Sequence, residues 1–291
     1  MRKLFQSVID PVLFSNIFMS LCAVTQALVT LQLIGARPTY PLLILLFTST
    51  LFIYNISIFL SKPKRPARSP FRRMRWFFYY YKAMVVITAA CAVSLVPLFF
   101  LISERSRLLL ILLSVLSVGY SLPIFKKGNK RFGLRNVPGI KSLMITLVWV
   151  MSCVVLPIFE SEHWQQIRVS VSDEAILIAK RALFIFALTI PFDIRDLFQD
   201  STAGTKTIPV IFGEKKAYLF CQALLAGYMV LLFLFKGNGF NHDFFALSLT
   251  AILMGWLIFK SEWEKDEYYY FFYMDGVLIL QYVFLVAFSF I

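Results

Sequence analysis

The sequence predicts an all-α fold: a multi-pass membrane bundle of nine transmembrane helices in a single domain, residues 1–291. Three observations predict it. Apolar residues make up 59% of the chain and charged residues 15%, whereas soluble proteins average roughly 45–50% and about 25%. Long apolar segments recur from one end of the chain to the other. Lys and Arg are concentrated in alternate connections between these segments.

The apolar segments are long enough to cross a membrane as helices. A hydrocarbon core about 30 Å thick requires about 20 helical residues. Backbone groups in lipid must bond within their own segment, which favours helix over any open structure. The segments are expected at roughly 11–34, 41–60, 78–102, 107–124, 141–159, 175–192, 216–235, 243–259 and 270–291.

The charges of the connections predict the orientation. When the N-terminus is placed inside, the inner connections hold 21 of the 29 Lys and Arg residues, and the outer connections hold five. The positive-inside rule therefore favours nine spans in the cytoplasmic (inner) membrane, with the N-terminus inside and the C-terminus outside. The same distribution accounts for most of the net charge of +13, so no nucleic-acid partner is expected.

Several polar residues lie inside the apolar segments. Lys180 and Arg181 are near the outer end of the sixth segment, where they are expected to extend outward to the membrane surface. Gln26 is interpreted as a hydrogen bond between helices. Asp275 lies in the last segment, and an intramembrane carboxylate is by default a functional hypothesis. No disulfide or zinc site is expected, because none of the four cysteines forms a CxxC pair.

The stretch 191–209 carries the strongest chemical signal. Asp193, Asp196 and Asp200 are spaced at i, i+3 and i+7, so they would share one face if the helix continued through them. Like charges at this spacing repel one another. Mg²⁺ binds carboxylate oxygens and often bridges them to substrate phosphates, so the motif predicts a Mg²⁺–diphosphate site. The alternative is a solvated helix end whose aspartates pair with nearby basic side chains.

These residues resemble a known family. Asp193, Asp196 and Asp200 look like the second aspartate-rich motif of the UbiA superfamily of intramembrane prenyltransferases, as do the residues that follow them: Ala203-Gly204, Lys206-Thr207, Pro209 and Gly213. Family members have nine transmembrane helices and two such motifs, and they use Mg²⁺ to bind a prenyl diphosphate. The resemblance implies Mg²⁺ as cofactor, with the three aspartates as its catalytic ligands. It also implies a polyprenyl diphosphate and a membrane-resident acceptor as partners.

A second resemblance lies after the fourth apolar segment. Tyr120-Ser121, Lys126-Lys127 and the stretch that ends at Lys141 resemble the family's loop after helix four, in which basic residues contact the diphosphate. Asp275-Gly276 in the last segment is a weaker similarity. The resemblance implies a set of diphosphate-binding candidates: Lys126, Lys127, Lys141, Lys206, Asn55 and Tyr120.

The sequence departs from the family at the first motif, which reads N-x-x-x-D-x-x-x-D after the second helix. Asn55 is present, but Phe59 and Pro63 occupy the two aspartate positions, and no Asp or Glu occurs between residues 11 and 103. The adjoining segment 62–75 instead holds seven Lys and Arg residues. These residues either hold a diphosphate by charge in place of one metal ion or attract anionic lipid headgroups.

Together these features predict a UbiA-like prenyltransferase. Its reaction would transfer a prenyl group from a polyprenyl diphosphate to an aromatic or lipid acceptor within the membrane. The alternative, supported by the missing first motif, is a divergent, non-catalytic member that binds an isoprenoid or another lipid. A transporter is less favoured, because intramembrane charges are few and no paired broken helices are evident.

Overall fold

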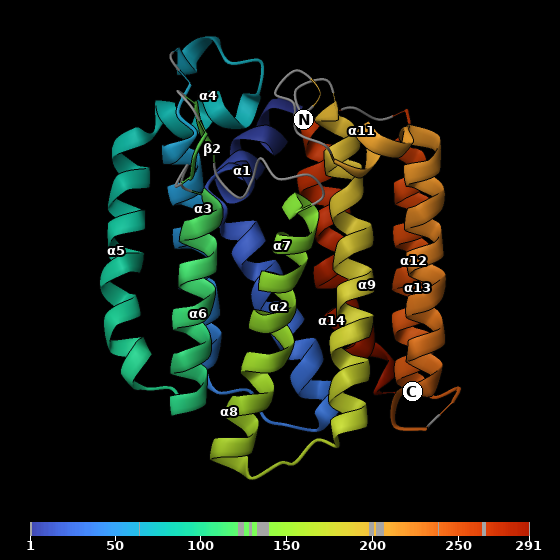
Figure 1. Ribbon diagram of the computed structural model, residues 1–291. Helices are drawn as coiled ribbons and strands as arrows, with labels where there is room; N and C mark the ends of the chain where they lie inside the picture. The colour runs from blue at the N-terminus through green and yellow to red at the C-terminus, as the bar shows by residue number, and fades with distance from the viewer. Residues whose placement is uncertain are drawn as a thin grey trace.

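The protein is seen in a computed structural model that describes residues 2–63, 65–121, 125–127, 130–132, 140–197, 201, 207–237, 239–263 and 266–290. It is a bundle of long helices that run roughly parallel or antiparallel to one another, as the sequence predicts (Figure 1). One small feature was not expected: a hairpin of two three-residue strands, β1 and β2, which pair antiparallel.

The α-helices and strands have the following bounds: α1 Arg2–Phe14, α2 Ile17–Ile34, α3 Tyr40–Leu60, α4 Arg72–Tyr79, α5 Tyr81–Phe100, α6 Glu104–Ser121, β1 Phe125–Lys127, β2 Lys130–Phe132, α7 Ile140–Val150, α8 Leu156–Gln165, α9 Val171–Arg195, α11 Ile208–Phe212, α12 Glu214–Leu234, α13 His242–Lys260 and α14 Asp275–Phe288. Two π-helical segments interrupt the regular helix: η3 Met151–Val155, between α7 and α8, and η5 Tyr269–Met274, before α14. Short 3₁₀ turns lie at η1 Pro66–Arg68 and η4 Phe235–Gly237.

Eight helical segments in the described part of the chain are long and apolar enough to cross a membrane, and they match eight of the nine expected segments. The remaining expected segment, 107–124, corresponds to α6, which lies lengthwise in the bundle beside α3 and α7 (Figure 1). Its 18 residues begin with the charged turn Glu104-Arg105-Ser106-Arg107, so α6 is more polar than the other spans. The chain is an integral membrane protein.

The connections differ between the two ends of the bundle. The end with α1, α4, the β-hairpin and α11, here called the basic end, carries the long connections, whereas the connections at the other end are short (Figure 1). Helix α14 ends at the end opposite to α1 (Figure 1). Opposite ends for the first and last helices fit an odd number of crossings.

The first expected segment, 11–34, is divided into two helices. Asn16 lies between α1 and α2 with a φ of 71°, and Asn tolerates this left-handed conformation better than most residues. Its side chain is buried, and its Nδ2 donates to Asn55 Oδ1 at 2.7 Å. Asn55 Nδ2 then donates to Thr88 Oγ1 at 3.1 Å. This chain of hydrogen bonds joins α2, α3 and α5 beneath the basic end.

A second buried polar cluster surrounds Arg181 in α9. Arg181 is 4% exposed, so the expectation that it extends to the membrane surface is wrong. Its guanidinium points inward because oxygen acceptors are available there: Gln281 Oε1 at 3.3 Å, the Gln26 carbonyl at 3.3 Å and Thr30 Oγ1 at 3.4 Å. Gln26 also donates to the Leu278 carbonyl at 2.7 Å. The interpretation of Gln26 as a packing hydrogen bond is confirmed.

Lys180, the neighbour of Arg181, is buried without such partners. It is 3% exposed, which also contradicts the expectation that it extends outward. Its Nζ has no hydrogen-bond partner among the described residues and lies 3.9 Å from the centre of the Phe235 ring. A desolvated ammonium without hydrogen bonds costs free energy that a cation–π contact offsets only in part.

Substitution by Met should therefore affect the free energy of unfolding differently at these two adjacent residues. Arg181→Met should lower the free energy of unfolding by about 1–3 kcal/mol, because it leaves buried acceptors unpaired. Lys180→Met should leave stability unchanged or raise it, because it removes an unpaired buried charge. Thermal unfolding of the purified protein in detergent measures both. Equal destabilisation by the two variants would contradict the assignment.

Candidate functional site

A cavity of about 200 Å³ lies near the basic end, between residues of α2, α3, α4, α7, α9, η5 and α14. Part of its lining is apolar and aromatic and includes Met19, Tyr54, Trp149 and Leu278. Six ionisable side chains of acidic or basic type also line it: Arg73, Lys141, Asp193, Arg195, Asp196 and Asp275. Three of the expected site residues, Lys141, Asp193 and Asp196, therefore line the same cavity as these apolar side chains.

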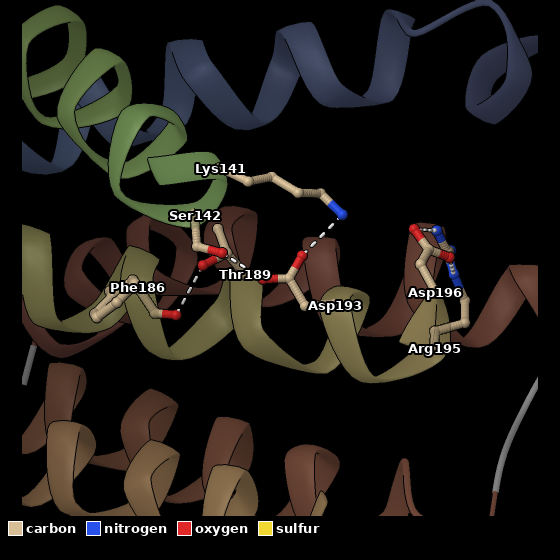
Figure 2. A network of polar contacts seen from close by, with 7 residues as sticks. All are labelled: Lys141, Ser142, Phe186, Thr189, Asp193, Arg195 and Asp196. Carbon is tan, nitrogen blue, oxygen red and sulfur yellow. Dashed lines mark hydrogen bonds and ion pairs between the residues drawn. The ribbon is translucent and has the colours of Figure 1, made fainter. Parts of the chain in front are cut away.

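Asp193 is held by two residues of the first turn of α7. Its Oδ1 lies 2.9 Å from Lys141 Nζ, and its Oδ2 accepts a hydrogen bond from Ser142 Oγ (Figure 2). Asp193 is only 2% exposed, so the Lys141 ammonium and the Ser142 hydroxyl replace the hydrogen bonds that water would donate to the carboxylate at the surface. The pair joins the end of α9 to the start of α7 and directs both charges toward the cavity.

Asp196 has a different partner. Helix α9 ends at Arg195, so the helix does not continue through the motif as the shared-face expectation required. Arg195 Nε lies 2.9 Å from Asp196 Oδ1 (Figure 2). The guanidinium also stacks over the rings of Tyr270 and Phe271, at 5.0 and 5.3 Å from their centres. Despite the turn, Asp193 and Asp196 still line the same cavity.

The donor set suits a hard divalent cation bound together with phosphate. No group of three or more His, Cys, Asp or Glu side chains close enough to hold a metal occurs within the described ranges. Asp200, the third expected ligand, and Lys206 both lie outside those ranges. Mg²⁺ commonly uses one or two carboxylates and completes its shell with water and substrate phosphate oxygens. Asp193 and Asp196 are the two described carboxylates of the motif that could contribute to such a shell.

Arg73 is a cavity residue that the sequence did not single out within the basic segment 62–75. Its guanidinium donates to Asn16 Oδ1 and lies 4.8 Å from the centre of the Phe271 ring. Burial lowers the pKa of Arg73 to about 10, so it stays charged at neutral pH. Lys62 behaves differently, because its Nζ lies over the rings of Phe78 and Tyr81.

Helix α4, which carries Arg73, is fixed at its N-terminus. The Glu267 carboxylate accepts hydrogen bonds from the backbone N–H groups of Arg72 and Arg73 at 2.6 and 3.0 Å. An anion at a helix N-terminus is stabilised by the unpaired N–H groups and the helix dipole. Arg72 also pairs with Asp10 at 2.7 Å, and Asp10 accepts from Tyr268, whose pKa is raised by burial and by this contact. Acidic residues from two distant segments thus hold the basic helix in place.

Asn55, a diphosphate-binding candidate, lies behind the cavity wall. It is fully buried and bonds to Asn16, which in turn accepts from Arg73. Its observed contacts therefore orient Arg73 through Asn16. Three other candidates are placed by their backbones alone: Tyr120 in α6, and Lys126 and Lys127 in β1. Their side chains fall outside the described part of the structure.

Two further cavities adjoin this one between the helices. A second cavity of about 260 Å³ shares Tyr54, Lys141, Ile145 and Trp149 with it. A third, of about 320 Å³ between α3, α5 and α6, shares Ile53 and Ser117 with the second. Tyr54 and Trp149 meet at the first junction, where Trp149 Nε1 donates to the Tyr54 hydroxyl at 3.3 Å.

The sequence contained a partial signal for the residues that were missed. Ser142 is adjacent to Lys141, and Arg195 lies within the aspartate motif. Arg73 is one of seven basic residues in a short segment, and nothing in the local pattern indicates which of them enters the bundle.

Three solved structures share this fold. The apo structure of a UbiA homologue from Aeropyrum pernix K1 is 13% identical, with a TM-score of 0.65 over 94% of this chain and 98% of that chain. A UbiA homologue from Archaeoglobus fulgidus bound to GPP and Mg²⁺ is 14% identical, with a TM-score of 0.62 over 97% and 100%. A structure described for digeranylgeranylglyceryl phosphate synthase in membranes is 15% identical, with a TM-score of 0.56 over 99% and 98%.

No curated protein sequence matches the chain. A family model described as the UbiA prenyltransferase family matches residues 79–275. The match spans more than half of the chain, includes Lys141, Asp193 and Asp196, and begins after the segment in which the first aspartate-rich motif is missing. The fold, the remaining motif and this match together place the chain in the UbiA prenyltransferase family.

Proposed function

We propose that this protein is an intramembrane prenyltransferase. It transfers the prenyl group of a polyprenyl diphosphate to an aromatic or lipid acceptor. The observation that carries the proposal is the single cavity in which Asp193, Asp196 and three basic side chains face an apolar lining. A prenyl diphosphate has the same division, with a highly charged head and a hydrocarbon tail.

The charged wall would bind the diphosphate. Lys141, Arg73 and Arg195 supply positive charge from three different helices, and guanidinium groups match phosphate oxygens in a bidentate manner. Asp193 and Asp196 would hold Mg²⁺, which neutralises charge on the departing diphosphate when it is bound. Lys126, Lys127 and Lys206 are further candidates for the same head group, and Asp200 for the metal.

The apolar wall would protect the reacting carbon. Departure of the diphosphate leaves carbocation character at C1 of the prenyl group, which water would capture. Met19, Trp149 and Leu278 line the cavity and exclude water from that position. The two adjoining cavities would accommodate the rest of the prenyl chain, which runs past Tyr54 and Trp149 toward α3, α5 and α6.

The proposed placement in the membrane follows from charge. The basic end would face the cytoplasm, with the N-terminus inside and the C-terminus outside, in the inner membrane. Residues 62–75 would also contact anionic lipid headgroups. The whole chain would act as one domain, because the cavity wall is built from α2 through α14.

A divergent lipid-binding protein is the second candidate, and the absence of the two aspartates of the first motif favours it. Phe59 occupies an aspartate position and packs against the rings of Phe77 and Tyr81, at 5.1 and 5.7 Å between centres. That site is aromatic, so it offers no carboxylate to a second metal ion. Turnover decides between the two candidates.

The first test is Mg²⁺-dependent transfer from labelled prenyl diphosphates of several chain lengths by the purified protein in lipid, with membrane extract as acceptor source. Asp193→Asn and Asp196→Asn should each lower kcat/KM at least about 100-fold, a loss of about 2.7 kcal/mol of transition-state stabilisation. Glu262→Gln removes an exposed charge at the same end and should change kcat/KM less than about twofold.

The outcomes separate the candidates. Turnover that both aspartate variants lose supports a transferase with one aspartate motif. Mg²⁺-dependent binding that needs the aspartates, without turnover at any chain length, supports the divergent binder. A protein that binds no prenyl diphosphate would contradict both.

A second prediction concerns Arg73. Arg73→Met should raise the KM for the prenyl diphosphate about 10- to 100-fold, because it removes a charged ligand from the cavity wall. Arg73→Lys should recover part of the loss. Lys62→Met is the matched control from the same basic segment, and its KM should stay within about twofold of the wild type. Equal losses for Lys62 and Arg73 would indicate a general surface-charge effect.

A third prediction concerns chain length. Ser117 lines both the second and the third cavity. Ser117→Phe should block the passage between them and lower kcat/KM for a twenty-carbon donor at least about tenfold relative to a ten-carbon donor. Competition between the two labelled donors measures this ratio directly. An unchanged ratio would mean that the chain follows another path.

A further inference from the structure

Asp275 is a third carboxylate on the cavity wall, and it comes from a different helix than the aspartate motif. It is the first residue of α14 and follows the π-helical segment η5. The residue is 3% exposed, and its Oδ2 is buried without a hydrogen-bond partner. A carboxylate is costly in this state. A ligand that donates a hydrogen bond at this position would remove the cost.

The nearby cations have other partners. Arg195 pairs with Asp196, and Arg73 donates to Asn16. No ion pair between Asp275 and either guanidinium is found among the described residues. Both guanidinium groups line the same cavity and favour negative charge there. Asp275 Oδ2 is therefore a hydrogen-bond acceptor that no described protein group uses, on a cavity that two guanidinium groups also line.

Asp275 lies deeper in the bundle than the contact between Arg195 and Phe271. Phe271, four residues earlier, lies against Arg195, at 5.3 Å from its ring centre. Helix α14 runs from the basic end into the bundle (Figure 1), so Asp275 is about one turn, roughly 5 Å, below that level. Leu278 on the next turn also lines the cavity. Asp275 thus lies at the boundary between the charged wall and the apolar wall.

A group at this boundary would face the reacting carbon. When the diphosphate occupies the charged wall, C1 of the prenyl group is the first carbon on the apolar side. The acceptor must approach C1 from the side opposite to the leaving group. In its ionised form the Asp275 carboxylate accepts hydrogen bonds but donates none, so that form would orient an acceptor that presents an O–H group.

We propose that Asp275 binds the hydroxyl group of the acceptor, a phenol or an alcohol, and takes its proton during prenyl transfer. This inference rests on the proposed function. The O–H proton passes to Asp275 Oδ2, and the acceptor oxygen forms a bond to C1. The bond from C1 to the diphosphate oxygen breaks, and the diphosphate leaves with the electron pair. The proton returns to water when the products depart. Asp275 is thus a general base, separate from the residues that hold the donor.

The test uses full-length protein in lipid vesicles with labelled geranyl diphosphate and Mg²⁺. The acceptor probes are a 4-alkylphenol and a monoalkyl glycerol ether, each compared with its O-methyl derivative. The wild type should transfer label to a hydroxyl probe and not to the matching methyl ether. Whichever hydroxyl probe becomes labelled shows whether the acceptor is a phenol or an alcohol.

Asp275→Asn keeps the shape of the side chain and removes its basicity. It should lower transfer at least about 100-fold, while the dissociation constant of the donor stays within about twofold of the wild type. Asp275→Glu should recover part of the rate. A merely structural role would lower donor binding together with transfer, and Glu would not rescue it. Glu262→Gln again serves as the control for loss of a carboxylate at this end.

Three results would overturn the inference and leave the donor site intact. These are transfer by Asp275→Asn within about threefold of the wild type, equal labelling of the methyl ethers, or donor binding by the wild type without transfer to either hydroxyl probe. Loss of Mg²⁺-dependent donor binding in Asp275→Asn would instead assign Asp275 to the metal site. Failure of the wild type to bind the donor would overturn the proposed function itself.

Discussion

The ion pair between Lys141 and Asp193 is the contact on which the basic end of the bundle depends. Both side chains are largely withdrawn from water, and each would be costly alone. Together they join α7 to α9 and hold two opposite charges at the cavity. The same balance extends around the wall, where three basic and three acidic side chains of the described residues face one space. In the proposed reaction, a charged ligand would meet positive charge that is already fixed at the cavity, so little reorganisation would be needed.

The basic segment is organised by acidic residues from elsewhere in the chain. Glu267 accepts from the first N–H groups of α4, and Asp10 pairs with Arg72. This anchoring sets the direction of Arg73, which reaches Asn16 and the cavity. The chain thus lacks two aspartates at the first motif, and the Arg73 guanidinium lines the cavity that holds Asp193 and Asp196. Positive charge supplied by a side chain needs no carboxylate ligands, which is consistent with the absence of Asp and Glu from residues 11 to 103.

Polar side chains also order the bundle away from the cavity. Arg181 bonds to acceptors on α2 and α14, and Asn16 bonds to Asn55 on α3. Lipid supplies no hydrophobic force between helices, so hydrogen bonds and close packing contribute more to the choice of partners. The deeper cluster fixes α2, α9 and α14, which carry Met19, Asp193 and Asp275 to the cavity. The geometry of the site thus depends on contacts at membrane depth.

The sequence by itself determined the helical class, the membrane location and eight of the nine expected spans. Segment length, apolarity and the distribution of Lys and Arg are local properties, and a membrane constrains them strongly. The tertiary structure decided the rest. It ended α9 at Arg195, turned Arg181 inward and directed Arg73, but not Lys62, into the cavity. It also placed Asp275 on the same cavity as Asp193, 82 positions earlier, and Arg73, 202 positions earlier. The directions of Arg181 and Arg73 depend on partners from distant segments, and the local sequence does not identify those partners.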